Sequence, residues 1–185
     1  MIFKVDRTGK ETVLYTFTGG TDGGYPSWSD LVLDAAGNLY GTTQYYGDLT
    51  CPQSQPWALG CGVIFKLDPA GNQTVLHTFS GGADGGQPNG GLIRDTKGNL
   101  YGTATSGGAP SGACPTGCGV VFMLSPVGAL TVLHSFRGSD GAGPFGTLLL
   151  QNGYLYGVTA GSGNFSGVAF RLRPSHLPRR VLQVR

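Results

Sequence analysis

Short apolar segments alternate with glycine-rich turns along the whole chain of 185 residues. These segments are rich in β-branched and aromatic residues and are bounded by Gly, Asp, Asn or Pro, which is typical of strands. In the segment at 74–79, Val75, His77 and Phe79 would share one face, because successive side chains of a strand point to opposite faces. No stretch keeps apolar residues at a helical spacing, so the sequence predicts an all-β protein.

The segments fall into four types, A to D, which recur in a fixed order and so predict a repeat architecture. Type A is at 31–34, 92–95 and 148–151; type B, which contains LYG, is at 37–43, 98–104 and 153–159; type C is at 2–5, 64–67, 121–124 and 169–172; and type D is at 12–17, 74–79, 131–136 and 180–185.

Short turns join the types in pairs. DAAGN and DTKGN connect A to B in two copies, with an Asp that caps a type I turn and a Gly in the left-handed region. The third copy is one residue shorter, and its Asn152-Gly153 pair suits a two-residue type I′ turn. Each unit is therefore a four-stranded antiparallel meander, as in the blade of a β-propeller, and blades bury their faces by stacking on one another.

The order of the types predicts a partial ring. The chain begins with types C and D, and three complete sets follow, which gives fourteen strands and about three and a half blades. We expect a single repeat domain over 1–185, with a half blade and its connection at 2–30 and blades at 31–91, 92–147 and 148–185. Since closed propellers contain about four to eight blades, we expect a fragment of a longer array or a homodimer that closes a ring.

The repeat pattern VFKLDxxGxxTVLHTFxGGxDGxxPxxGLIRDxxGNLYGTT resembles the GloVer repeat, a tandem repeat of secreted or surface bacterial proteins that often carry a sorting anchor. The resemblance covers almost the whole chain and is densest at Ile64–Thr105. It implies a propeller-like β array and no catalytic residue set. The pattern is lost after Pro174, and we expect neither a leader nor an anchor within these residues.

Composition excludes several classes of function. The 34 glycines recur in register with apolar residues, charged residues make up only 12% of the chain and the net charge is +2, which fits a folded domain better than a disordered tail. There is no basic face for nucleic acid and no apolar run long enough for a membrane helix. Because Met1 leads directly into a strand, we expect no signal peptide within these residues, and we expect a mature or partial form of an extracellular or cell-surface protein.

The D-to-A and B-to-C connections should emerge on one face, which is the candidate ligand face. A repeated aspartate followed by glycine lies in each D-to-A loop and could bind Ca²⁺ or a sugar, but one carboxylate among glycines favours an Asx-type turn. These aspartates are Asp22, Asp84 and Asp140.

Aromatic residues on the same loops could stack on sugar rings or on a partner, or could cap the core. They are Trp28, Tyr45, Tyr46 and Trp57. His77 and His134 recur in type D, but Tyr15 and Gln183 occupy the same position, so a packed strand position is favoured over catalysis.

The four cysteines lie in the B-to-C loops. Disulfides Cys51–Cys61 and Cys114–Cys118 would close two long loops and would indicate an oxidising compartment. A zinc site shared by four thiolates is the alternative, although the spacings do not match those of zinc knuckles.

The sequence thus favours a non-enzymatic extracytoplasmic module with a structural role or with a glycan or protein ligand. We predict no cofactor, metal or catalytic residue, because no nucleophile–base set, phosphate loop or carboxylate pair has an interpretable spacing. Two alternatives stay open: a carbohydrate-active propeller enzyme, either a lyase or a glycoside hydrolase, and a self-associating architectural repeat.

Overall fold

The computed structural model describes residues 1–26, 30–51, 59–161 and 167–174. Every regular element in these ranges is a β-strand, which confirms the all-β prediction. Nothing helical in this part of the chain has the length and apolar character of a membrane span.

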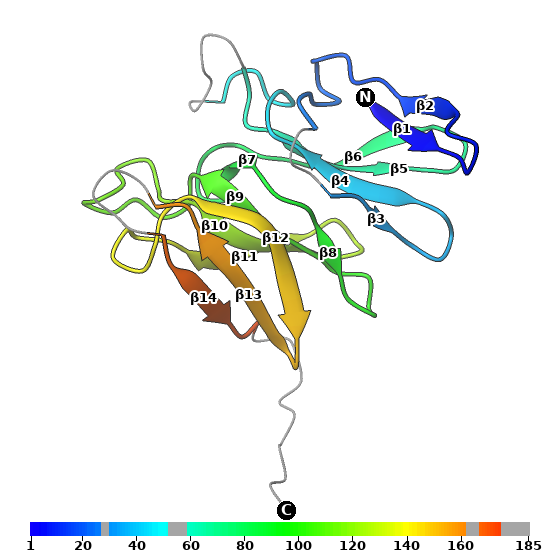
Figure 1. Ribbon diagram of the computed structural model, residues 1–185. Coiled ribbons are helices and arrows are strands. Elements are labelled where there is room, and N and C mark those ends of the chain that lie inside the picture. Colours follow the sequence, from blue (N-terminus) through cyan, green and yellow to red (C-terminus); the bar gives the residue numbers. More distant parts are fainter. Residues whose placement is uncertain (27–29, 52–58, 162–166, 175–185) are drawn as a thin grey trace, which may run out of the picture.

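Antiparallel strands form four sheets that follow one another along the chain and lie side by side in Figure 1. We call them sheets I to IV. Sheet I contains β1 (Ile2–Val5) and β2 (Glu11–Tyr15); sheet II contains β3 (Val32–Leu33), β4 (Leu39–Thr43), β5 (Val63–Leu67) and β6 (Gln73–Thr78); sheet III contains β7 (Gly86–Pro88), β8 (Ile93–Arg94), β9 (Leu100–Ser106), β10 (Val120–Leu124) and β11 (Leu130–Ser135); and sheet IV contains β12 (Pro144–Gln151), β13 (Tyr154–Thr159) and β14 (Ala169–Leu172).

The sheets have the order of a propeller-like array. Sheet II runs β3-β4-β5-β6, which matches types A to D, and sheet I contains only types C and D. The number of blades and the domain boundaries stay predictions. The predicted D strand at 180–185 lies outside the described residues.

The type A strands differ most from the sequence prediction. β3 and β8 are only two residues long, and the unpredicted β7 pairs with β9 ahead of β8. In sheet IV the same two pieces form one strand, β12, whose register shifts between Phe145 and Leu149. A short apolar phrase therefore marked the position of the inner strand but not its length.

The glycine of the LYG phrase is required by close packing. In sheet III, Gly102 pairs with Phe122 across β9 and β10, and a Cβ on Gly102 would lie 2.6 Å from Cζ of Phe122 and 2.9 Å from Cδ2 of Leu92. Gly41 and Gly157 have the same surroundings in sheets II and IV. The phrase recurs because each sheet lays a phenylalanine ring across this glycine.

The core lies between successive sheets. An aromatic ring that follows the D strand of one sheet packs edge-on against the type C phenylalanine of the next sheet, at centroid distances of 5.2, 5.3 and 5.2 Å. The pairs are Phe17–Phe65, Phe79–Phe122 and Phe136–Phe170. A separate apolar cluster surrounds each pair. Since a fully buried phenylalanine contributes about 1.5–3 kcal/mol, these contacts stabilise the stack.

Candidate functional site

Backbone hydrogen bonds join the D-to-A and B-to-C loops into one continuous surface, which we call the loop face. The amide of Gly47 donates to the carbonyl of Gly20, and the amide of Gly108 donates to the carbonyl of Gly82, at 3.0 and 2.8 Å. The loops also connect neighbouring sheets, because the amide of Gln87 donates to the carbonyl of Cys61 at 2.8 Å. The structure thus brings together the two sets of loops that the sequence placed on one face.

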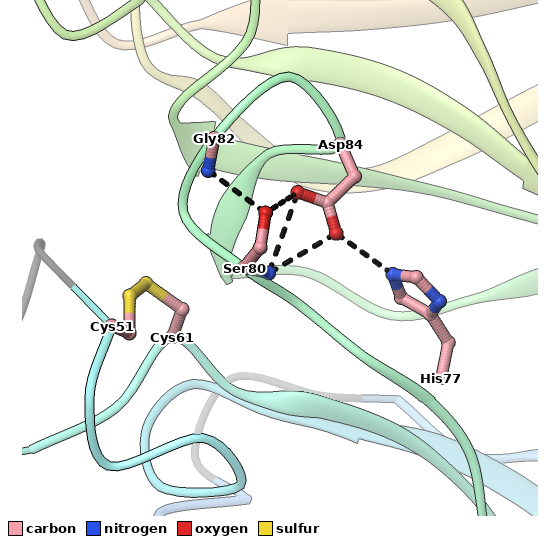
Figure 2. A network of polar contacts seen from close by, with 6 residues as sticks. All are labelled: Cys51, Cys61, His77, Ser80, Gly82 and Asp84. Carbon is pink, nitrogen blue, oxygen red and sulfur yellow. Dashed lines mark hydrogen bonds and ion pairs between the residues drawn. A yellow bond between two sulfur atoms is a disulfide. The ribbon is translucent and has the colours of Figure 1, made fainter.

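A carboxylate clasp closes the D-to-A loop between sheets II and III (Figure 2). Asp84 accepts hydrogen bonds from the backbone amide of Ser80 at 3.1 Å, from Nε2 of His77 at 3.0 Å, and from the Ser80 hydroxyl. The Ser80 hydroxyl oxygen in turn accepts from the amide of Gly82 at 3.1 Å. Burial raises the pKa of Asp84, but the hydrogen bonds from His77 and Ser80 outweigh it and hold this pKa below its ordinary value. Asp84 is therefore an ionised turn residue at neutral pH.

The first D-to-A loop has an equivalent clasp with different donors. Asp22 accepts from the hydroxyl of Tyr15 at 2.9 Å and from the amide of Thr18 at 2.8 Å. Burial raises the pKa of Asp22, but the hydrogen bonds from Thr18 and Tyr15 outweigh burial and hold this pKa below its ordinary value. A tyrosine can replace histidine at this position because each presents a polar donor at the tip of a ring.

The third D-to-A loop repeats the clasp in a more exposed setting. Asp140 accepts from Nε2 of His134 at 2.9 Å and from the amide of Arg137 at 2.8 Å. Sequence reasoning assigned the histidines and the aspartates separately and missed that they bind each other. The available signal was the spacing of six or seven residues between the ring and the aspartate in all three copies.

The clasps do not have the connectivity of a nucleophile–base pair. In Figure 2 the Ser80 hydroxyl donates to Asp84 and not to His77, so the carboxylate lies between the other two groups. An activated serine needs its hydroxyl bonded to the base. The arrangement fits a turn that is closed by hydrogen bonds.

Tyrosines cluster on the loop face of sheet II. Tyr25 stacks on Tyr46 with 6.2 Å between ring centroids and 12° between ring planes, and meets the edge of Tyr45 at 5.7 Å. Tyr45 is buried, whereas the side chain of Tyr25 is 52% exposed. Tyr25 and Tyr46 both have left-handed backbones, with φ of 54° and 66°, which non-glycine residues adopt at a cost.

Tyr25 was not among the predicted site residues, because it lies in a short D-to-A loop and its backbone conformation cannot be read from the sequence. The residue before the proline of each D-to-A loop is left-handed, with φ of 54° at Tyr25, 55° at Gln87 and 59° at Gly143. Glycine is the residue that suits this position best, yet two of the three copies carry a larger residue, Tyr25 and Gln87. The other two aromatic candidates, Trp28 and Trp57, lie outside the described residues.

The cysteines are paired as the sequence favoured. Cys51 is bonded to Cys61 and Cys114 to Cys118, with Cα atoms 5.8 and 5.4 Å apart. Figure 2 shows Cys51–Cys61 beside the Asp84 clasp. The pairing leaves no free thiolate for the zinc alternative. Within the described ranges, no three His, Cys, Asp or Glu side chains come together as a metal site.

A second set of carboxylates lies at the A-to-B turns, at the opposite end of the sheets. Asp34 accepts from the side-chain amide of Asn38 at 2.9 Å and from the hydroxyl of Tyr40 at 3.0 Å. These bonds, that from Asn38 foremost, lower the pKa of Asp34 from 3.8 to about 2. Asp95 has the same bonds in sheet III, where burial first and this carboxylate second raise the pKa of Tyr101. The turn role of these aspartates was predicted, and their tyrosine partners were not.

Comparison with family models gives a match over almost the whole chain. Residues 1–183 match the model of the Gloeobacter/Verrucomicrobia repeat. The chain belongs to this repeat family. The resemblance to the GloVer repeat is thereby confirmed, and the recurring clasps, disulfides and LYG phrases are features of one member of this family.

Comparison with solved structures gives distant neighbours of this repeat protein. A candidate gluconolactonase is 18% identical with a TM-score of 0.48, and the match covers 91% of this chain and 55% of that one. A luciferin-regenerating enzyme is 13% identical with a TM-score of 0.43, and the match covers 80% of this chain and 61% of that one. The repeat protein therefore spans a little over half the length of these structures. No curated protein matches the chain.

Proposed function

We propose that the chain is a non-enzymatic β-propeller repeat module that acts outside the cytoplasm and binds glycans through its loop face. The observation that carries the proposal is the cluster of Tyr25, Tyr45 and Tyr46. The buried Tyr45 packs against Tyr25, and Tyr25 is half exposed to solvent. The faces of sugar rings are apolar and stack on such aromatic planes.

The strained backbone supports a binding role for this cluster. Left-handed tyrosines persist only where their surroundings hold them, and such residues concentrate at functional sites. The amide of Tyr46 donates to the carbonyl of Leu59 at 2.6 Å, and its carbonyl accepts from Gly62 at 2.9 Å. The backbone that carries the Tyr46 ring is thus held before any ligand arrives, which reduces the entropy lost on binding.

The clasps and the disulfides support the other two parts of the proposal. Each clasp carboxylate is already engaged by local donors, whereas a glycosidase needs two carboxylates directed at its substrate. Disulfides persist in oxidising compartments and are rare in the cytosol, which favours an extracytoplasmic location.

A glycan array followed by titration calorimetry tests the proposal. We expect the wild-type chain to bind at least one polysaccharide class without turning it over, and Tyr25→Ala to weaken that binding about tenfold. Tyr154→Ala is the matched control, because Tyr154 starts β13 at the opposite end of its sheet and should leave binding unchanged. Equal affinities for wild type and Tyr25→Ala would exclude this site, and release of reducing ends would exclude the non-enzymatic role.

A self-associating architectural role is the second candidate. Large apolar side chains are exposed on the two outermost sheets, I and IV, and this observation favours it.

A further inference from the structure

Sheet I exposes an apolar surface on the side away from sheet II. Met1, Phe3, Val5 and Val13 are 61%, 52%, 57% and 50% exposed. Phe3 and Val13 are cross-strand partners in β1 and β2, so these residues form one continuous patch. We call it the N-terminal end face.

Each residue of the N-terminal end face has a counterpart in the interior sheets that is buried in, or packed against, a cluster between two sheets. The same positions in sheet II are Val63, Phe65, Leu67 and Val75, which belong to the cluster between sheets I and II. In sheet III they are Val120, Phe122, Leu124 and Val132, which belong to the cluster between sheets II and III. Phe65 and Phe122 are both fully buried. The N-terminal end face is therefore one complete half of an inter-sheet contact.

Sheet IV exposes the other half. Leu149 and Val158 are 57% and 52% exposed, and Ala169, the cross-strand partner of Val158, is also exposed. We call these three residues the C-terminal end face. Their counterparts in sheet III are Ile93, Thr103 and Val121; Thr103 and Val121 are buried, and Ile93 packs against the cluster shared with sheet IV.

The two end faces are complementary, because the chain joins the same two halves internally. Ile64 of sheet II is equivalent to Ala169, and Phe122 of sheet III is equivalent to Phe3. These two residues meet in one cluster between sheets II and III. An exposed apolar patch of this kind marks an interaction surface. Its geometry is already set by the internal contacts.

We propose that two copies of this chain associate head to tail, with the C-terminal end face of one copy packed on the N-terminal end face of the other. The inference rests on the self-associating role given above as the second candidate, and it is independent of glycan binding. It specifies a heterologous contact, in which each copy uses two different surfaces.

Light scattering after size exclusion tests the association at several protein concentrations. We expect the wild-type chain to have the mass of two copies, or of a larger multiple, at micromolar concentration. Phe3→Asp and Val158→Asp each put a charge into one half of the contact. Each should raise the protein concentration at which half of the oligomer dissociates by more than about tenfold. Val127→Asp is the control, because Val127 is 89% exposed at a turn of sheet III and belongs to neither face.

Mixing the two variants separates a head-to-tail contact from a symmetric one. Phe3→Asp keeps an intact C-terminal end face and Val158→Asp keeps an intact N-terminal end face, so an equimolar mixture should restore a dimer through one contact. Circular dichroism of each variant should match that of the wild type, since both substitutions lie on exposed surface. A monomeric wild type would overturn both the self-association and the interface. If both variants form oligomers as readily as the wild type, or if the mixture stays monomeric, the proposed interface is wrong while self-association itself still stands.

Discussion

Phe3 and Phe122 occupy the same position of the repeat, yet one is half exposed and the other is completely buried. Both lie in a strand that begins with a β-branched residue, and both lie on the side of their sheet that is turned away from the following sheet. The difference arises because sheet II covers Phe122, whereas nothing in the described residues covers Phe3. In a stacked array a residue's burial thus depends on whether its sheet has a neighbour.

The largest expected effect is a direct contrast between these two phenylalanines. Phe122→Ala should lower the free energy of unfolding by about 3–5 kcal/mol, because it leaves a cavity between sheets II and III. Phe3→Ala should cost less than about 1 kcal/mol in the dilute monomer, where its ring is already half in water. Urea unfolding at low protein concentration measures both. Similar losses for the two variants would mean that sheet I is covered in solution.

The LYG glycines extend the contrast to backbone packing. Gly102→Ala places a methyl group against Phe122 and Leu92, both buried, and should cost about 1–3 kcal/mol. Gly157→Ala meets the buried Leu148 and also Phe170, which is only half-buried and can move, so its cost should be smaller. Gly112→Ala, with no atom within 4 Å of the new Cβ, is the neutral control. Thermal unfolding orders the three variants, and equal midpoints would contradict the close packing.

The clasps should follow the same gradient from the interior to the end of the array. Asp84→Ala removes an acceptor whose side chain is 22% exposed and leaves the amide of Ser80 without its partner, so it should cost about 1–3 kcal/mol. Asp140→Ala, where the carboxylate is 40% exposed, should cost about 1 kcal/mol or less. Urea unfolding of both variants provides the measurement. A larger loss at Asp140 would reverse the proposed gradient.

The smallest effect is the pH dependence of stability. Hydrogen bonds lower the native pKa of Asp34 from 3.8 to about 2, and those of Asp22 and Asp84 are lowered too. Because the unfolded chain then takes up protons first, this stabilisation is complete above a pH of about 4 and is lost as the pH falls towards 2. The thermal midpoint should therefore decline over this interval, and Asp34→Asn should reduce the decline. A midpoint that rises on acidification would have the wrong sign.

The sequence allowed most of the fold to be predicted because its signals are local. Glycines in turns and β-branched residues in strands marked the B, C and D strands of the described residues within a residue or two. The Asn152-Gly153 turn was identified from its own two residues. The inner strand was less predictable, since β7 pairs with β9 through residues that include Gly86 and Pro88, which carry no strand signal. Such pairing depends on the neighbouring strands.

The candidate site was harder to predict because its contacts cross between segments. The Asp84–His77 bond joins the end of one strand to a loop, and each residue alone has several ordinary explanations. Tyr25 gave no signal of its own, because neither its left-handed backbone nor its stacking on Tyr46 can be read from one sequence. The disulfides were predictable, since each pair lies within a single loop.

The phenylalanine pair between each sheet and the next has a consequence for the evolution of repeat number in such genes. Every junction joins the same ring position of one unit to the same ring position of the following unit. A duplication or deletion of one whole unit therefore leaves a phenylalanine pair at every remaining junction, wherever in the unit the breakpoints fall. Arrays of this kind can lengthen or shorten in evolution without inventing a new core.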